Sequence, residues 1–128
     1  MERSKDWLDQ AKRDLEHARM DIEQKYFEWA CFSAQQAAEK AVKAVFMKLG
    51  AEAWGHSVSD LLEKLEEKYP VSQELKTGAL ELDKAYIPAK YPNAHPSSYP
   101  ARRYTEPEAR RMIEDAEKII KFCQGLLS

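Results

Sequence analysis

The sequence predicts an all-α fold: an up-and-down bundle of about five helices, with a long proline-rich loop before the last one, in a single domain over residues 1–128. Apolar residues repeat at intervals of three and four, the period of a helix that is buried on one side. Helix breakers are rare outside one window, since five of the six prolines lie between positions 88 and 107. No segment of useful length alternates apolar and polar residues as a strand does.

Two long helices are expected first, over residues 4–24 and 27–49. The first has one apolar stripe and begins at Ser4, which is a plausible N-cap. The second is apolar over most of its circumference, so it is either central in the bundle or faces a second subunit. Gly50 is the expected C′ residue of this helix. The polar exceptions on it are Gln35, Gln36, Glu39, Lys40 and Lys43.

Three further helices each begin at a residue that can cap the first turn with a hydroxyl oxygen. These capping residues are Ser57, Ser72 and Thr105. The helix from Ser57 is expected to end at the Tyr69-Pro70 pair, and the helix from Ser72 to reach position 86. The last helix is expected to stop near position 125.

Composition excludes several classes of protein. No window of 18 uncharged apolar residues exists, and the first residues lack the apolar core of a signal peptide, so we expect a cytoplasmic protein without a membrane span. Cys31 and Cys123 have no zinc or disulfide spacing and are interpreted as small buried hydrophobes. Dinucleotide, P-loop and metal-binding motifs are absent, so neither a cofactor nor a metal is predicted.

The segment 87–104 does not fit the helical plan, because it is longer than a routine connection between helices. Between positions 84 and 111 there are six Lys or Arg against two Glu, a local charge of +4 that leaves −6 for the rest of the chain. Basic groups attract phosphate and tyrosines stack on bases. Two interpretations of this segment have equal weight: a connector that packs on the bundle, and a loop that binds a ligand. The candidate ligand residues are Lys90, Tyr91, Arg102, Arg103 and Tyr104.

His95 is the strongest candidate for chemistry, because histidine titrates near neutrality and can transfer protons. Lys90, five residues earlier, would place a cation beside it, which suits the binding or cleavage of a phosphodiester. His56 is interpreted instead as a helix-entry residue that hydrogen-bonds to the backbone, and His17 as a solvated side chain on the polar side of the first helix.

Three stretches resemble the HEPN domain, a name that stands for higher eukaryotes and prokaryotes nucleotide-binding. They are residues 7–15, residues 26–44 and the Gly-His-Ser triplet at 55–57, and the most specific part is Gln35-Gln36-Ala-x-Glu39-Lys40-x-x-Lys43. Later, Lys90-Tyr-Pro and Arg103-Tyr-Thr fit the same prokaryotic, stand-alone type. The resemblance covers nearly the whole chain.

The resemblance implies a helical bundle that usually forms a homodimer and often pairs with a minimal nucleotidyltransferase as a toxin–antitoxin couple. Many members are metal-independent ribonucleases with an Arg-x4–6-His motif at the dimer interface. Lys90-x4-His95 has that spacing, but lysine lacks the planar donor fork of arginine. The favoured function is therefore a subunit that binds a nucleotide or RNA. The alternatives are a ribonuclease toxin that uses His95 and Lys90, and a structural helical adaptor.

Overall fold

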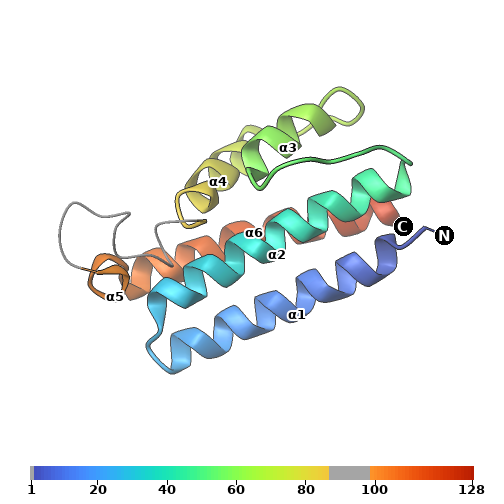
Figure 1. The fold of residues 1–128 in the computed structure, drawn as a ribbon. Helices are drawn as coiled ribbons and strands as arrows, with labels where there is room; N and C mark the ends of the chain where they lie inside the picture. The colour runs from blue at the N-terminus through green and yellow to red at the C-terminus, as the bar shows by residue number, and fades with distance from the viewer. Residues whose placement is uncertain (1, 87–98) are drawn as a thin grey trace.

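Three long helices lie side by side in the computed structural model, which describes residues 2–86 and 99–128 (Figure 1). They are α1 (Ser4–Glu23), α2 (Phe27–Lys48) and α6 (Glu106–Leu127). A hairpin of two shorter helices, α3 (Val58–Leu65) and α4 (Gln73–Asp83), packs along α2 and α6. The described residues contain helices and no strand, so the predicted all-α bundle is confirmed.

Helix α2 is central, since it contacts each of the other helices. This position accounts for its nearly continuous apolar circumference. Its small side chains allow the neighbouring helix backbones to approach closely. Six of its alanines have no exposed surface: Ala30, Ala34, Ala37, Ala38, Ala41 and Ala44.

The end of α2 turns the chain back on itself. Gly50 has a φ of 69°, and its amide donates to the Met47 carbonyl while the Ala51 amide donates to the Phe46 carbonyl. This pair of hydrogen bonds is a Schellman motif, and it confirms Gly50 as the C′ residue. The segment 49–57 then runs back beside α2 to the start of α3 (Figure 1). A second left-handed residue, Gly55 with a φ of 87°, precedes His56 in this segment.

The three predicted hydroxyl caps are confirmed. Ser57, Ser72 and Thr105 accept hydrogen bonds from the amides of Asp60, Leu75 and Glu108 at 3.1, 3.2 and 3.3 Å. The predicted N-cap at Ser4 is wrong. Ser4 is the first residue of α1, and Arg3 occupies the N-cap position. The ends shift by one or two residues in α1, α2 and α6. Helix α3 stops at Leu65, after which turns lead to position 69, and α4 stops at Asp83, short of the predicted position 86.

The predicted irregular segment 87–104 contains a helix that the sequence reasoning missed. The four-residue helix α5 (Pro100–Arg103) begins with a proline, whose fixed φ suits the first turn and whose missing N–H costs nothing there. Pro100 is buried, so packing against the bundle stabilises a turn that is too short to form alone. Residues 87–98 lie outside the described residues.

Two other sequence expectations concern the bundle as a whole. In the described residues, no helix combines the length and the apolar character that a membrane span requires. Cys31 and Cys123 are fully buried free thiols, as expected, and burial raises the pKa of each to about 12.

The start of α3 is held by a carboxylate from another helix. Asp83, at the end of α4, accepts hydrogen bonds from the hydroxyls of Ser57 and Ser59 at 2.8 and 2.6 Å. It also accepts from the amides of Val58 and Ser59 at 2.6 and 3.1 Å. A carboxylate at a helix N-terminus interacts favourably with the helix dipole and with otherwise unpaired N–H groups. Asp83 therefore joins the two helices of the hairpin and fixes the position of the residue before them, His56.

We expect Asp83→Ala to lower the free energy of unfolding by about 2–3 kcal/mol, because charge-assisted hydrogen bonds to the amides and hydroxyls are lost. Urea denaturation followed by circular dichroism measures this change. Asp60→Ala is the matched control, since this exposed carboxylate lies at the same helix end and should cost only about 0.3–1 kcal/mol. Equal losses of stability in the two variants would contradict the role of Asp83 in holding the start of α3.

Candidate functional site

A carboxylate is buried in the middle of the central helix. The Glu39 side chain is 6% exposed. It accepts hydrogen bonds from Lys43 Nζ at 3.0 Å, from Gln35 Nε2 at 3.2 Å and from His56 Nδ1 at 3.1 Å. A buried charge is costly unless it is paired and hydrogen-bonded, and here it is both. These four residues form what we call the Glu39 cluster.

The amide of Gln35 connects the cluster to the segment that follows α2. Its Nε2 also donates to the His56 carbonyl oxygen at 2.8 Å, and its Oε1 accepts from Gln36 Nε2 at 2.7 Å. Gln35 has no exposed surface. Because its donors are satisfied by one residue on its own helix and by one from segment 49–57, Gln35 holds that segment in register against α2.

His56 presents the cluster to solvent. Its side chain is 55% exposed, and its ring stacks on the ring of Tyr86, with centroids 4.6 Å apart and an interplanar angle of 13°. Since an ionised carboxylate can only accept, the contact with Glu39 places a proton on Nδ1. In the neutral ring, Nε2 then carries the lone pair. Within the described residues the hydrogen bonds of this ring all use Nδ1.

The sequence reasoning missed this cluster. It interpreted His56 as bonded to the backbone, but the imidazole binds the Glu39 carboxylate and only the carbonyl of His56 accepts from Gln35. It also treated Gln35 and Glu39 as polar exceptions without a role. A usable sign was present: Gln35, Glu39 and Lys43 recur every four residues and therefore share one face of a helix that is otherwise apolar.

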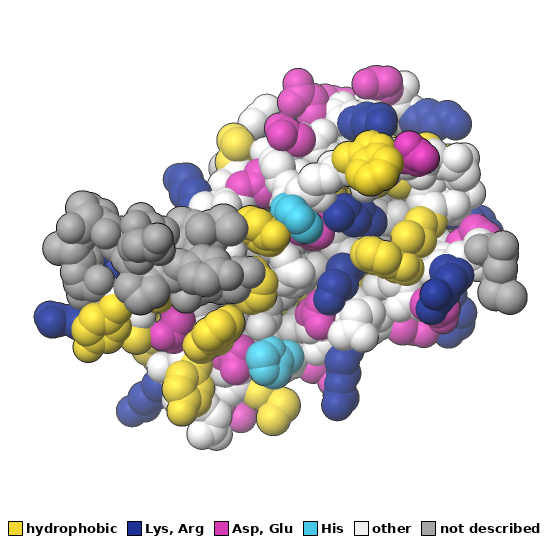
Figure 2. Space-filling model, viewed as in Figure 1, with side chains coloured by type: hydrophobic (Ala, Val, Ile, Leu, Met, Phe, Trp, Pro, Cys, Tyr) yellow, Lys and Arg dark blue, Asp and Glu magenta, His cyan; other side chains and the backbone are white. Residues whose placement is uncertain are grey.

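A second exposed histidine is His17 on α1, and Figure 2 shows two histidine side chains on one face of the molecule. The sequence predicted a solvated side chain, and the ring is 62% exposed, but Nδ1 lies 3.0 Å from Ser33 Oγ and 3.4 Å from Asp21 Oδ2. Burial raises the pKa of the Asp21 carboxyl. Both contacts use the same ring nitrogen, so this group cannot pass a proton from serine to carboxylate as a catalytic triad does.

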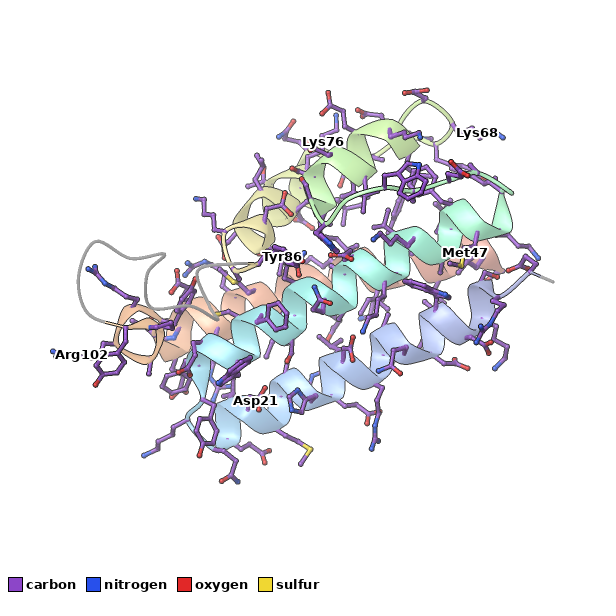
Figure 3. The ribbon with its side chains drawn as sticks, viewed as in Figure 1. Asp21, Met47, Lys68, Lys76, Tyr86 and Arg102 are labelled. Atoms are coloured by element: carbon purple, nitrogen blue, oxygen red, sulfur yellow. The ribbon has the colours of Figure 1, made fainter. Side chains whose placement is uncertain are left out.

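The residues predicted from the sequence as ligand contacts are distributed differently. Lys90, Tyr91 and His95 lie outside the described residues. Arg102 and Arg103 are exposed on α5, and Figure 3 shows Arg102 at one end of the bundle, well separated from Tyr86.

Tyr104 is 8% exposed and belongs to the core. Its hydroxyl donates to the Lys84 carbonyl at 3.4 Å, and burial raises its pKa to about 12. This burial favours a packing role for Tyr104 over the base-stacking role that the sequence suggested.

The chemistry available at the Glu39 cluster is that of an oriented imidazole with a cation nearby. A histidine held by a carboxylate can accept or donate a proton at its outer nitrogen or bind an anion when protonated. Across residues 2–86 and 99–128, no group of three His, Cys, Asp or Glu side chains could hold a metal ion.

We expect Glu39→Ala to lower the free energy of unfolding by about 3 kcal/mol, since it leaves the half-buried Lys43 ammonium and the buried Gln35 amide without their acceptor. Chemical denaturation measures the loss. Glu16→Ala removes an exposed carboxylate from α1 and should change stability very little. Comparable losses in the two variants would show that the cluster does not hold the fold.

The model of the HEPN domain family matches residues 4–126 of this chain. Among curated proteins, the chain is 24% identical over 130 residues to a protein of Methanocaldococcus jannaschii named "Putative toxin MJ1304", with 94% of this chain and 86% of that protein covered.

Solved structures agree with this family. TT1696 of Thermus thermophilus is 45% identical, with a TM-score of 0.95 over 98% of this chain and 99% of its own. The HEPN domain protein TM0613 of Thermotoga maritima is 53% identical, with a TM-score of 0.79 over 94% and 96% of the two chains. The archaeal HEPN homologue ST0689 is 39% identical, with a TM-score of 0.85 over the full length of both chains. The chain therefore belongs to the HEPN domain family.

Proposed function

We propose that this protein is a subunit that binds a nucleotide or RNA and acts with a minimal nucleotidyltransferase in a toxin–antitoxin-like pair in the cytoplasm. Membership of the HEPN family supports this proposal, as does the toxin name of the Methanocaldococcus jannaschii relative. The two buried free thiols are consistent with a reducing compartment.

The observation that carries the proposal is the His56–Tyr86 stack above the Glu39 carboxylate. Tyr86 is the last described residue before the segment that contains Lys90, Tyr91 and His95. An imidazole that can bind phosphate thus lies where the basic, tyrosine-rich part of the sequence begins. Together these groups supply the cation and the aromatic surface that single-stranded nucleic acid requires.

The exposed arginines of α5 extend this surface in the proposal. Arg102 and Arg103 lie in the part of the chain with the local charge of +4 and are expected to contact phosphates. Lys90 and Tyr91 are assigned the same binding role, and His95 is kept for proton transfer in the ribonuclease alternative.

We expect a fluorescently labelled single-stranded RNA to bind at low salt and to dissociate as salt is raised. The double variant Arg102→Ala/Arg103→Ala should bind more weakly and reduce the salt slope by about 1.4, roughly 0.7 for each lost phosphate contact. Fluorescence anisotropy measures both quantities. The charge-matched control is Lys5→Ala/Arg13→Ala, which removes two exposed cations from α1 and should leave the slope unchanged.

Other outcomes of that experiment identify the alternatives. If no RNA or nucleotide binds at low salt, the structural adaptor is favoured and the proposal is wrong. Incubation with RNA in EDTA, beside His95→Ala, addresses the ribonuclease. Cleavage that His95→Ala abolishes would assign an enzyme, whereas equal cleavage by both proteins would indicate a contaminant.

A homodimer remains part of the proposal. Three large apolar side chains are exposed around the α1–α2 turn, namely Met20, Tyr26 and Trp29 at 62, 56 and 43%. Figure 2 shows apolar side chains gathered in that region. We expect sedimentation velocity to report a dimer, and Trp29→Ser to shift it toward monomer because burial of the indole is lost. A strict monomer at all concentrations would contradict this prediction.

The proposed pairing with a nucleotidyltransferase is tested by co-expressing the two proteins. Co-purification would support the pairing, and its absence would contradict it.

A further inference from the structure

A pocket with two tryptophans opens where α1, the end of α2 and the segment after it meet. Trp7 and Trp54 both line it, its floor includes Phe46 and Met47, and Lys43 reaches it from α2. Met47 is labelled in Figure 3 and marks the place of the pocket along α2. The volume of the pocket is about 320 Å³, at the lower end of the range of small-molecule binding pockets.

Trp54 is unusual because its large apolar side chain is 78% exposed. The indole is nevertheless anchored, since Nε1 donates to Glu52 Oε2 at 3.1 Å. The hydrogen bond fixes the edge of the ring system and leaves its faces for stacking. Trp7, by contrast, is partly buried against the core and forms a firm wall. An anchored, exposed ring and a partly buried ring that line the same pocket suit a flat aromatic ligand.

Charges of both signs lie at this pocket: Glu52 lines it, and Lys64 lines an adjacent depression that shares Phe46 and Ala51 with it. Lys64 Nζ lies 5.8 Å from the centroid of the Phe46 ring and donates to the Glu52 carbonyl at 3.3 Å. The described part of the chain places no carboxylate within ion-pair distance of this ammonium group, whereas Lys43 is paired with Glu39. Beyond Trp7, a second depression is lined by Arg3 and Lys40, which are paired with Asp6 and Asp14. Figure 2 shows apolar side chains on this face with both basic and acidic side chains around them.

We infer that this pocket binds the base of a phosphate-bearing nucleotide: the base stacks on Trp54 and Trp7, and the phosphate contacts Lys64. The assignment rests on the proposed function and specifies where its ligand binds. Stacking on an aromatic side chain is tolerant of base identity, while an ammonium group without a carboxylate partner is the natural contact for phosphate. The same chemistry is offered by a free mononucleotide and by one nucleotide of a single-stranded RNA.

Lys43 connects the pocket to the Glu39 cluster. It lines the pocket and also donates to the Glu39 carboxylate, which in turn holds His56. A ligand at the pocket therefore lies beside the same network that orients the exposed imidazole. The two surfaces form one continuous region of α2 and segment 49–57.

Tryptophan fluorescence tests the assignment directly, because two of the three tryptophans line the pocket. AMP and a short oligoadenylate are titrated separately into the full chain. We expect quenching by at least one of them, and Trp54→Ala should weaken that binding by about tenfold or more. Trp54→Phe should retain part of the affinity, since it keeps an aromatic face. Leu80→Ala is the control, since it removes an exposed apolar side chain of α4 that does not line the pocket, and it should leave the affinity unchanged.

Lys64→Met separates the phosphate contact from stacking. It should weaken AMP binding several-fold and leave adenosine binding unchanged. Circular dichroism verifies that the Trp54 and Lys64 variants are folded. We expect them to be, since both side chains are exposed. Quenching by AMP alone identifies a mononucleotide site, and quenching by the oligonucleotide alone identifies a site for RNA.

The inference and the proposed function can fail separately. If RNA binds through Arg102 and Arg103 in the anisotropy assay but Trp54→Ala changes no affinity, the pocket assignment is overturned and the proposed function stands. If AMP, adenosine and oligoadenylate all leave the fluorescence unchanged, the pocket takes no base and the inference is wrong. If AMP binds with loss in Trp54→Ala but RNA does not bind, the pocket stands and the RNA arm of the proposed function falls.

Discussion

The buried carboxylate of Glu39 is the constraint on which the surrounding structure depends. A charge in the middle of the central helix must be paired, and its partners come from two places. Lys43 and Gln35 lie on the same helix, one turn away on either side, and His56 comes from the segment that follows α2. Pairing of the Glu39 carboxylate with His56 therefore helps to hold that segment against α2.

From this interaction the rest of the site follows along the chain. Gly50 reverses the direction of the backbone and Gly55 turns it again, so that segment 49–57 returns along α2. The carbonyl and the ring of His56 are then both fixed by α2. Asp83 holds the N-terminus of α3, the helix that follows His56. Tyr86, three residues after Asp83, stacks on the His56 imidazole. A rigid bundle thus positions an exposed, functional ring through a short series of hydrogen bonds.

Local rules were sufficient for most of the helices. The hydroxyl caps at Ser57, Ser72 and Thr105 act within one turn, so the sequence alone could predict them. The helix at Pro100 was missed because four residues do not show a helical period, and packing against the bundle decides whether such a turn forms. The cap at Ser4 was predicted wrongly, since a capping residue type is permissive and does not fix the first residue of a helix.

The helical class, the long helices and the family could be predicted from the chain alone, because they depend on periodicity and on motifs that are contiguous in the sequence. Which polar residues meet became apparent only in the folded protein. Glu39 and His56 are 17 positions apart, and the pocket joins Trp7 with Trp54 across a helix and a turn. No local pattern encodes such a distance, since it depends on how the chain reverses and which faces pack. The buried polar network and the aromatic pocket are therefore properties of the fold that periodicity alone does not reveal.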